Sequence, residues 1–215
     1  MRMRGKSTLF IILVLVVSAY MTYGQHNSCW ELAIEKNDVE VFVHQSHESR
    51  TRGFKAVTTL SIPFDSVETI FDDIAEYPKW QSNVKTAKIM HEVSDVEYHF
   101  ATRTSLPWPS KNQDLMWRAE KEWDIKDGSL VYNQVCSNNT MPEKVRNSAV
   151  VQAFASWRLT PMSESEVKIT YYLTVDQRGK IPTWIINMLN PDAPFDTLSN
   201  LQGMTLNSGD QIALE

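Results

Sequence analysis

The sequence lacks the short motifs by which many enzymes hold a nucleophile, a nucleotide or a metal ion. It contains no Gly-x-Ser-x-Gly turn, no phosphate-binding loop and no glycine-rich dinucleotide-binding turn. His44 and His47 are close in sequence, but no third ligand lies near them, and two histidines do not make a metal site. We therefore expect no metal, no cofactor and no catalytic residue, and we favour a non-enzymatic role.

Cysteine is also scarce, since the chain contains only Cys29 and Cys136. In an exported protein these two thiols could form a disulfide, although the sequence does not fix such a pairing. The alternative is two separate thiols, one of them buried in a strand.

The first 24 residues differ in kind from the rest of the chain. Arg2, Arg4 and Lys6 precede an almost unbroken apolar run from Leu9 to Ala19. This run is shorter than the roughly 20 residues that a membrane-spanning helix needs, and basic residues followed by such a run are typical of a secretory signal peptide. We expect cleavage near Gly24 and export to the periplasm or the outside of the cell. An uncleaved anchor is the alternative.

Cleavage would leave an acidic protein. The leader holds three of the 21 basic residues and no acidic ones, so 18 basic residues remain against 26 acidic ones, a formal charge of −8. No basic run is present that could neutralise the phosphates of a nucleic acid, so nucleic acid is excluded as a partner. No polybasic segment could hold an anionic membrane surface either, and we expect any membrane contact to be transient and apolar.

What the sequence does contain is the alternation of apolar and polar residues that is typical of strands. Residues 30–44 divide at the turn dipeptide Asn37-Asp38 into a hairpin, and a third strand is expected over 53–60. Six further strands are expected over 84–93, 97–105, 115–123, 130–136, 149–160 and 166–175. The connections between them are short and polar, which permits antiparallel pairing and leaves no room for parallel crossovers.

Helical spacing of apolar residues occurs in two places. The first is Pro63 to Ile74, which we expect to end before Tyr77-Pro78 because the residue before a proline disfavours helical angles. The second begins at Ile181 and is interrupted by Pro191-Asp-Ala-Pro194, where an interior proline predicts a kink or a break. The break could be the hinge of a lid or a bend that wraps the helix around the sheet.

Four segments together carry a family resemblance. Asp176 to Asn187 reads D-x-x-G-x-I-P-x-W-x-x-N, and the others are Ser105 to Asp114, Ala155 to Pro161 and Tyr77 to Trp80. In order and spacing they resemble the START (StAR-related lipid-transfer) domain family over roughly residues 30–206. The chain departs from the family at Asn112-Gln113-Asp114, where an arginine is expected beside the aspartate, so no role of that arginine is carried over.

The resemblance implies an α+β helix-grip fold: a long curved antiparallel sheet wrapped around a C-terminal helix, with an early short helix after the third strand. The division expected is a signal peptide over residues 1–24, a START-like lipid-binding domain over 25–206 and a C-terminal tail over 207–215. A monomer is expected.

A strongly curved sheet covered by a helix encloses more interior than its own side chains readily fill, so we expect an apolar cavity. The candidate ligand-binding residues are Trp117, Tyr132, Phe154, Trp157 and Tyr171 from strands and Trp184, Ile185 and Met188 from the helix. Taken singly, each of these is as readily explained as ordinary core, and only the set favours a cavity.

Arg103 and Arg118 lie in predicted strands and complete the candidate site. An inward arginine could anchor the polar group of a lipid. Alternatively, both arginines face solvent, paired with acidic residues among Glu97, Asp114 and Glu120.

Three functions remain open. The first is binding, or transfer, of a lipid or sterol-like molecule. The second is a cyclase or aromatase on the same scaffold, which would use Arg103, His99, Tyr171 and Arg118 for proton transfer. The third is an interaction module whose core is completely filled.

Overall fold

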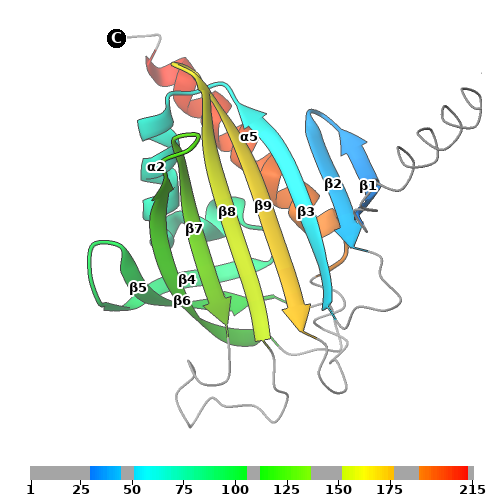
Figure 1. The fold of residues 1–215 in the computed structure, drawn as a ribbon, viewed down its shortest axis with the longest axis vertical. Coiled ribbons are helices and arrows are strands. Elements are labelled where there is room, and N and C mark those ends of the chain that lie inside the picture. Colours follow the sequence, from blue (N-terminus) through cyan, green and yellow to red (C-terminus); the bar gives the residue numbers. More distant parts are fainter. Residues whose placement is uncertain (1–29, 45–50, 106–111, 137–151, 177–188, 213–215) are drawn as a thin grey trace, which may run out of the picture.

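The computed structural model describes residues 30–44, 51–105, 112–136, 152–176 and 189–212. Nine strands form one antiparallel sheet in the order β1-β2-β3-β9-β8-β7-β6-β5-β4 (Figure 1). Their bounds are β1 Trp30–Lys36, β2 Val39–His44, β3 Thr51–Leu60, β4 Val84–Glu92, β5 Glu97–Thr104, β6 Gln113–Asp124, β7 Ser129–Cys136, β8 Gln152–Ser163 and β9 Glu166–Asp176. Every strand predicted from alternation is present, with ends that differ by a few residues.

The hairpin between β1 and β2 turns at the predicted dipeptide. Lys36 pairs with Val39, which leaves Asn37 and Asp38 as a two-residue loop. Both loop residues have positive φ, 51° and 58°. A tight hairpin that matches the twist of its strands requires this conformation, and asparagine and aspartate tolerate it better than most residues do.

The early helix is shorter than predicted and ends for a different reason. Helix α2 spans Phe64–Asp72 and buries Val67 and Phe71. Asp73 leaves the helical region with ψ 83°, and its side chain accepts a hydrogen bond from the amide of Ala75. A 3₁₀ turn, η1 (Ile74–Glu76), and the helical turn α3 (Tyr77–Trp80) follow. The prediction that Tyr77-Pro78 stops the helix was wrong, because Pro78 lies in a first turn, where its missing amide costs nothing.

The terminal helix α5 spans Asp192–Ile212. It starts inside the proline-containing segment where a break was predicted, and Pro194 occupies its first turn. The first part of the helical pattern predicted from Ile181, up to residue 188, lies outside the described residues. The helix continues into residues 207–215, the range predicted as a tail.

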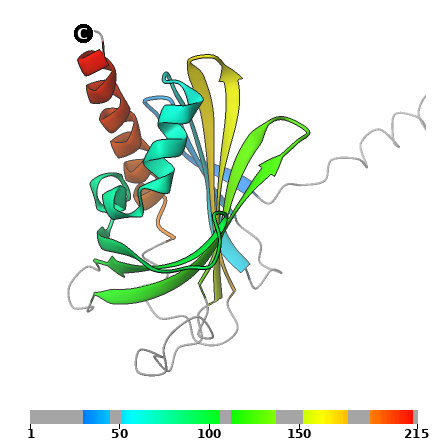
Figure 2. The ribbon, with the colours of Figure 1, turned by 90° about the vertical axis from the view of Figure 1, so that its left-hand side faces the viewer.

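The helices cover one face of the curved sheet. Figure 2 shows α2 and α5 on the concave side, with β4, β5 and β6 curling beneath them. The largest fully buried side chains, among them Trp80, Trp157, Phe71 and Tyr132, belong to the core cluster. The fold class predicted from the sequence is thereby confirmed. None of the helices within the described residues is long and apolar enough to cross a membrane.

Candidate functional site

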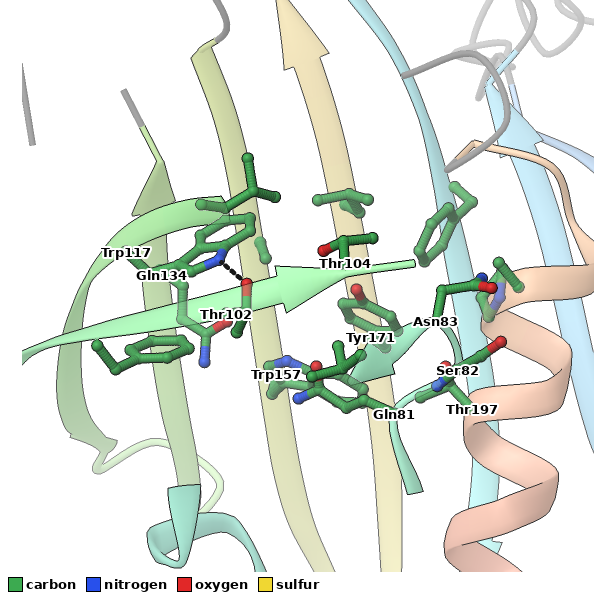
Figure 3. A pocket seen from close by; sticks show the side chains of 18 residues that line it. Gln81, Ser82, Asn83, Thr102, Thr104, Trp117, Gln134, Trp157, Tyr171 and Thr197 are labelled. Atoms are coloured by element: carbon green, nitrogen blue, oxygen red, sulfur yellow. Dashed lines mark hydrogen bonds between the residues drawn. The ribbon is translucent and has the colours of Figure 1, made fainter. Parts of the chain in front are cut away.

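A cavity of about 70 Å³ lies between the concave face of the sheet and the first turns of α5 (Figure 3). Its walls come from β3, the start of β4, β5, β6, β7, β8 and β9, and its roof from α5 and the segment that follows α3. The apolar part of the lining is Phe54, Val84, Phe100, Leu115, Trp117, Ala155, Trp157, Tyr171, Leu173, Ala193 and Pro194. The polar part is Gln81, Ser82, Asn83, Thr102, Thr104, Gln134 and Thr197.

Strand alternation decides which residues reach the cavity. On β5, Phe100, Thr102 and Thr104 are buried and line it, while Arg103 between them is exposed. On β8, Ala155 and Trp157 point inward in the same way. Because successive side chains of a strand point to opposite faces, each strand contributes every second residue to the site.

Aromatic contacts hold the walls in place. The Trp157 and Tyr171 rings, opposite each other on β8 and β9, stack with centroids 3.6 Å apart and planes inclined by 5°. Phe54 meets Tyr171 edge-on at 4.9 Å. Trp117 Nε1 donates a hydrogen bond of 3.1 Å to Thr102 Oγ1, which fixes the indole against β5. The edge-on geometry of Phe54 and Tyr171 adds to the stability that burial alone provides.

The roof is tied to the rest of the molecule by hydrogen bonds along α5. Thr197 Oγ1 accepts from the backbone amide of Ser82 at 3.0 Å, directly at the cavity. Further along the helix, Gln202 Nε2 donates to Thr58 Oγ1 at 2.8 Å, and so links α5 to β3. Since neutral hydrogen bonds contribute about 0.5–1.5 kcal/mol each, the contact of Thr197 with Ser82 can be broken at modest cost.

The described lining contains a single ionisable side chain, Tyr171. Burial raises the pKa of its phenol above the ordinary value, so Tyr171 stays neutral at physiological pH. No Asp, Glu, Lys, Arg or His is among the described lining residues. The described residues also hold no group of three or more potential metal ligands.

Three residues predicted to contact a ligand, Trp117, Trp157 and Tyr171, do line the cavity. Their contact with a ligand remains a prediction. Trp184, Ile185 and Met188 lie outside the described residues.

Arg103 and Arg118, named as candidate ligand-binding residues, do not face the described cavity. Arg103 Nε and Nη2 donate to the two carboxylate oxygens of Asp114 at 2.7 and 2.9 Å on the outer face. These bonds hold the pKa of the Asp114 carboxyl below its usual value. Arg118 pairs with Glu97 at 2.7 Å and also with Glu120. The solvent-facing alternative with these acidic partners is confirmed.

Phe154 and Tyr132 also lie away from the cavity. Phe154 is 42% exposed and faces outward, because it is an odd number of residues from the inward Trp157. Tyr132 is fully buried but packs beneath α2, where its ring stacks on Phe71 and its hydroxyl donates to Asp72 Oδ1 at 2.8 Å. Tyr132 therefore joins helix and sheet and does not line the pocket.

The polar lining was missed by sequence reasoning. Thr102 and Thr104 share the face of Phe100, and Gln134 shares the face of Tyr132. Counting positions along each strand would have found all three. Cys136 lies on the same face and is buried, with the pKa of its thiol raised to about 12 by burial. Its proposed partner Cys29 lies outside the described residues.

The sequence matches a known family and is similar to several known proteins. Residues 20–197 match the family model of the START domain. An uncharacterized protein of Pseudomonas aeruginosa is 23% identical over 195 residues, which cover 89% of this chain and 96% of that protein. Phosphatidylcholine transfer protein of Bos taurus is 23% identical over 166 residues, which cover 74% of this chain and 76% of that protein.

Solved structures share the fold. The STAR-related lipid transfer protein of Xanthomonas axonopodis aligns with a TM-score of 0.69 at 24% identity, over 82% of this chain and 98% of that one. Human StAR-related lipid transfer protein 5 aligns with a TM-score of 0.67 at 16% identity, over 95% and 99% of the two chains. Because the family model spans most of the sequence and the same fold recurs in these structures, the chain belongs to the START domain family.

Proposed function

We propose that the chain binds a lipid or another hydrophobic small molecule between the concave face of the sheet and α5. The observation that supports this most directly is the unfilled pocket walled by Trp117, Trp157 and Tyr171 and roofed by the first turns of α5. An apolar, aromatic lining with a few polar groups is the usual composition of a small-molecule site. Family membership supports the same function, since relatives carry the names phosphatidylcholine transfer protein and STAR-related lipid transfer protein.

A whole lipid does not fit the pocket while α5 occupies its present position. A cavity of about 70 Å³ holds roughly five to seven water molecules, whereas small-molecule sites commonly enclose about 300–1,000 Å³. Because Ala193, Pro194 and Thr197 line the pocket, displacement of the start of α5 would enlarge it. We infer that ligand entry lifts this end of the helix, and the segment Pro191–Pro194 would act as a hinge, one of the two roles considered for the proline break.

The small volume also supports a second candidate, an interaction module that carries no ligand. The two candidates differ in one observable property, the presence of a hydrophobic molecule in the interior. Native mass spectrometry of the purified chain tests this directly. Lipid binding predicts a co-purifying hydrophobic ligand, or uptake of a fluorescent lipid added afterwards. A protein that stays empty in both experiments would select the interaction module.

A variant that fills the pocket makes the test specific to this site. Ala155 is buried and lines the cavity, so Ala155→Phe should lower lipid affinity at least about tenfold, provided that the variant folds. Ser156→Phe is the matched control, because Ser156 lies on the opposite face of the same strand. Loss of binding in both variants would place the ligand elsewhere or indicate general destabilisation.

A cyclase or aromatase activity is less well supported. Of the residues that this function would require, Tyr171 lines the cavity, whereas Arg103 and Arg118 form ion pairs on the outer face. His99 contacts His91 across the edge hairpin and is not among the described lining residues. General acid–base catalysis needs such groups within hydrogen-bond reach of one substrate, and the described geometry does not bring them together.

The proposal extends to an exported, monomeric carrier that touches membranes transiently. The leader of residues 1–24, with basic residues before an apolar run, supports export. The acidic balance of the remaining chain supports a membrane contact without strong electrostatic attachment. Intact-mass measurement of protein recovered from the periplasm or medium should give a chain that begins near residue 25. Recovery of the full-length chain in a membrane fraction would favour the uncleaved anchor.

A further inference from the structure

Gln134 is the one described pocket-lining residue with a buried side-chain nitrogen that lacks a hydrogen-bond partner. The residue is 4% exposed and lies on the inward face of β7. In Figure 3 the Gln134 side chain extends from its strand below Trp117, and its amide group is drawn to the left of Trp157. A buried amide N–H without a partner is costly, so such groups in folded proteins are normally paired or await a partner.

The neighbouring polar groups do not satisfy this amide. Trp117 Nε1 already donates to Thr102 Oγ1, and the backbone amide of Ser82 donates to Thr197 Oγ1. The N–H groups of these two contacts are therefore already used without a ligand. The Gln134 nitrogen differs from them because it offers an N–H to whatever occupies the cavity.

The charge of the lining restricts what that occupant can be. Among the described lining residues no cationic side chain faces the cavity, since Arg103 and Arg118 lie on the outer face. A carboxylate moved into this site would lose its hydration without gaining a counter-charge from the described lining, which is far more costly than burying a neutral ester or alcohol. A neutral oxygen, in contrast, needs only one or two hydrogen-bond donors.

We propose that Gln134 donates a hydrogen bond to an uncharged ester, ketone or hydroxyl oxygen of a neutral lipid. We further propose that the cavity selects such ligands over carboxylates of the same chain length. The inference rests on the proposed function and deepens it, because it names the polar group that the site recognises and the residue that recognises it.

Three compounds that share a ten-carbon chain test the selectivity: decane, methyl decanoate and decanoate. Binding to the full chain is followed by intrinsic tryptophan fluorescence, because Trp117 and Trp157 line the cavity. At about pH 7.5 decanoate is ionised. We expect methyl decanoate to bind at least about tenfold more tightly than decanoate.

Substitution of Gln134 tests the role of the residue. Gln134→Leu removes the amide and keeps a similar volume, and Gln134→Met serves the same purpose if the leucine variant fails to fold. Either variant should bind methyl decanoate about tenfold more weakly and decane within about twofold of the original affinity. Asn133→Leu is the control: it removes an amide from the same strand, but on the outer face, where Asn133 donates to Glu122.

The possible results distinguish the selection of neutral ligands and the role of Gln134 from lipid binding itself. Tighter binding of decanoate than of its methyl ester would overturn the selection of neutral ligands and leave lipid binding intact. An unchanged preference for the ester in folded Gln134 variants would overturn the assignment of Gln134. If the chain binds none of the three compounds and no other lipid, the proposed function fails, and this inference fails with it.

Discussion

Neighbouring residues on one strand have different roles in this molecule. Trp117 lines the cavity, while Arg118, the next residue, is exposed and paired with Glu97. The sequence-based set of ligand contacts contained both, although a strand cannot point two successive side chains to the same face. The alternation in the sequence was therefore sufficient to exclude one of each such pair. It could not say which of the two faces is the interior.

We predict that Arg103→Ala and Arg118→Ala leave lipid affinity within about twofold of the original. Both ion pairs are exposed and lie on the outer face, so salt and water screen them and their loss should change stability little. Lipid titration and urea unfolding of each variant measure the two effects. Ala155→Phe provides the contrast, because it acts inside the cavity. A tenfold loss of affinity in either arginine variant would restore an arginine to the ligand site.

At the scale of elements, α5 and the segment after α3 meet at the cavity. The amide of Ser82 donates to Thr197 Oγ1, and both residues line the cavity. The sequence predicted a terminal helix and a break at its proline pair. It carried no sign that a threonine of this helix would meet a backbone amide more than a hundred residues earlier, since that contact depends on how the layers pack.

We predict that Thr197→Val speeds ligand exchange several-fold. Valine keeps the shape of threonine but cannot accept the hydrogen bond from Ser82, so the start of α5 is released more easily, at a cost in stability of about 1 kcal/mol. Stopped-flow lipid exchange and hydrogen exchange of the Ser82 amide report the change. Thr205→Val is the control, because the Thr205 hydroxyl bonds within α5, to the carbonyl oxygen of Gln202. Equal exchange rates in the two variants would show that Thr197 does not hold the roof.

For the whole molecule, the interior holds groups that resist ionisation. Burial raises the pKa of Cys136 from 9.0 to about 12. Burial is also the largest cause of the raised pKa values of four tyrosines, Tyr77, Tyr98, Tyr132 and Tyr171. In the unfolded chain these groups ionise near their ordinary values, while in the folded protein they remain protonated. The unfolded state therefore releases protons first as the pH rises.

We predict that the free energy of unfolding falls as the pH rises above the ordinary Cys136 value of 9.0, and more steeply above 10.0, where unfolded tyrosines ionise. Each group that is ionised only in the unfolded state lowers the free energy of unfolding by about 1.4 kcal/mol per pH unit. Urea unfolding between about pH 8 and 11 measures the slope. In Cys136→Ala the decline should begin about one pH unit higher. Constant stability over this range would contradict the buried, neutral state of these side chains.

The sequence by itself determined the strands, the early helix, the terminal helix and membership in a family with a helix-grip fold. These features follow from local periodicity and from motifs whose order is visible along the chain. The tertiary structure decided that the side-chain nitrogen of Gln134 lacks a partner at the cavity, that the strand arginines face solvent and that the cavity is small. Periodicity fixes the angle between neighbouring side chains along one element. How residues distant in sequence pack together decides which face of a strand is the inner one, which side chain it meets there and how much space remains between the layers.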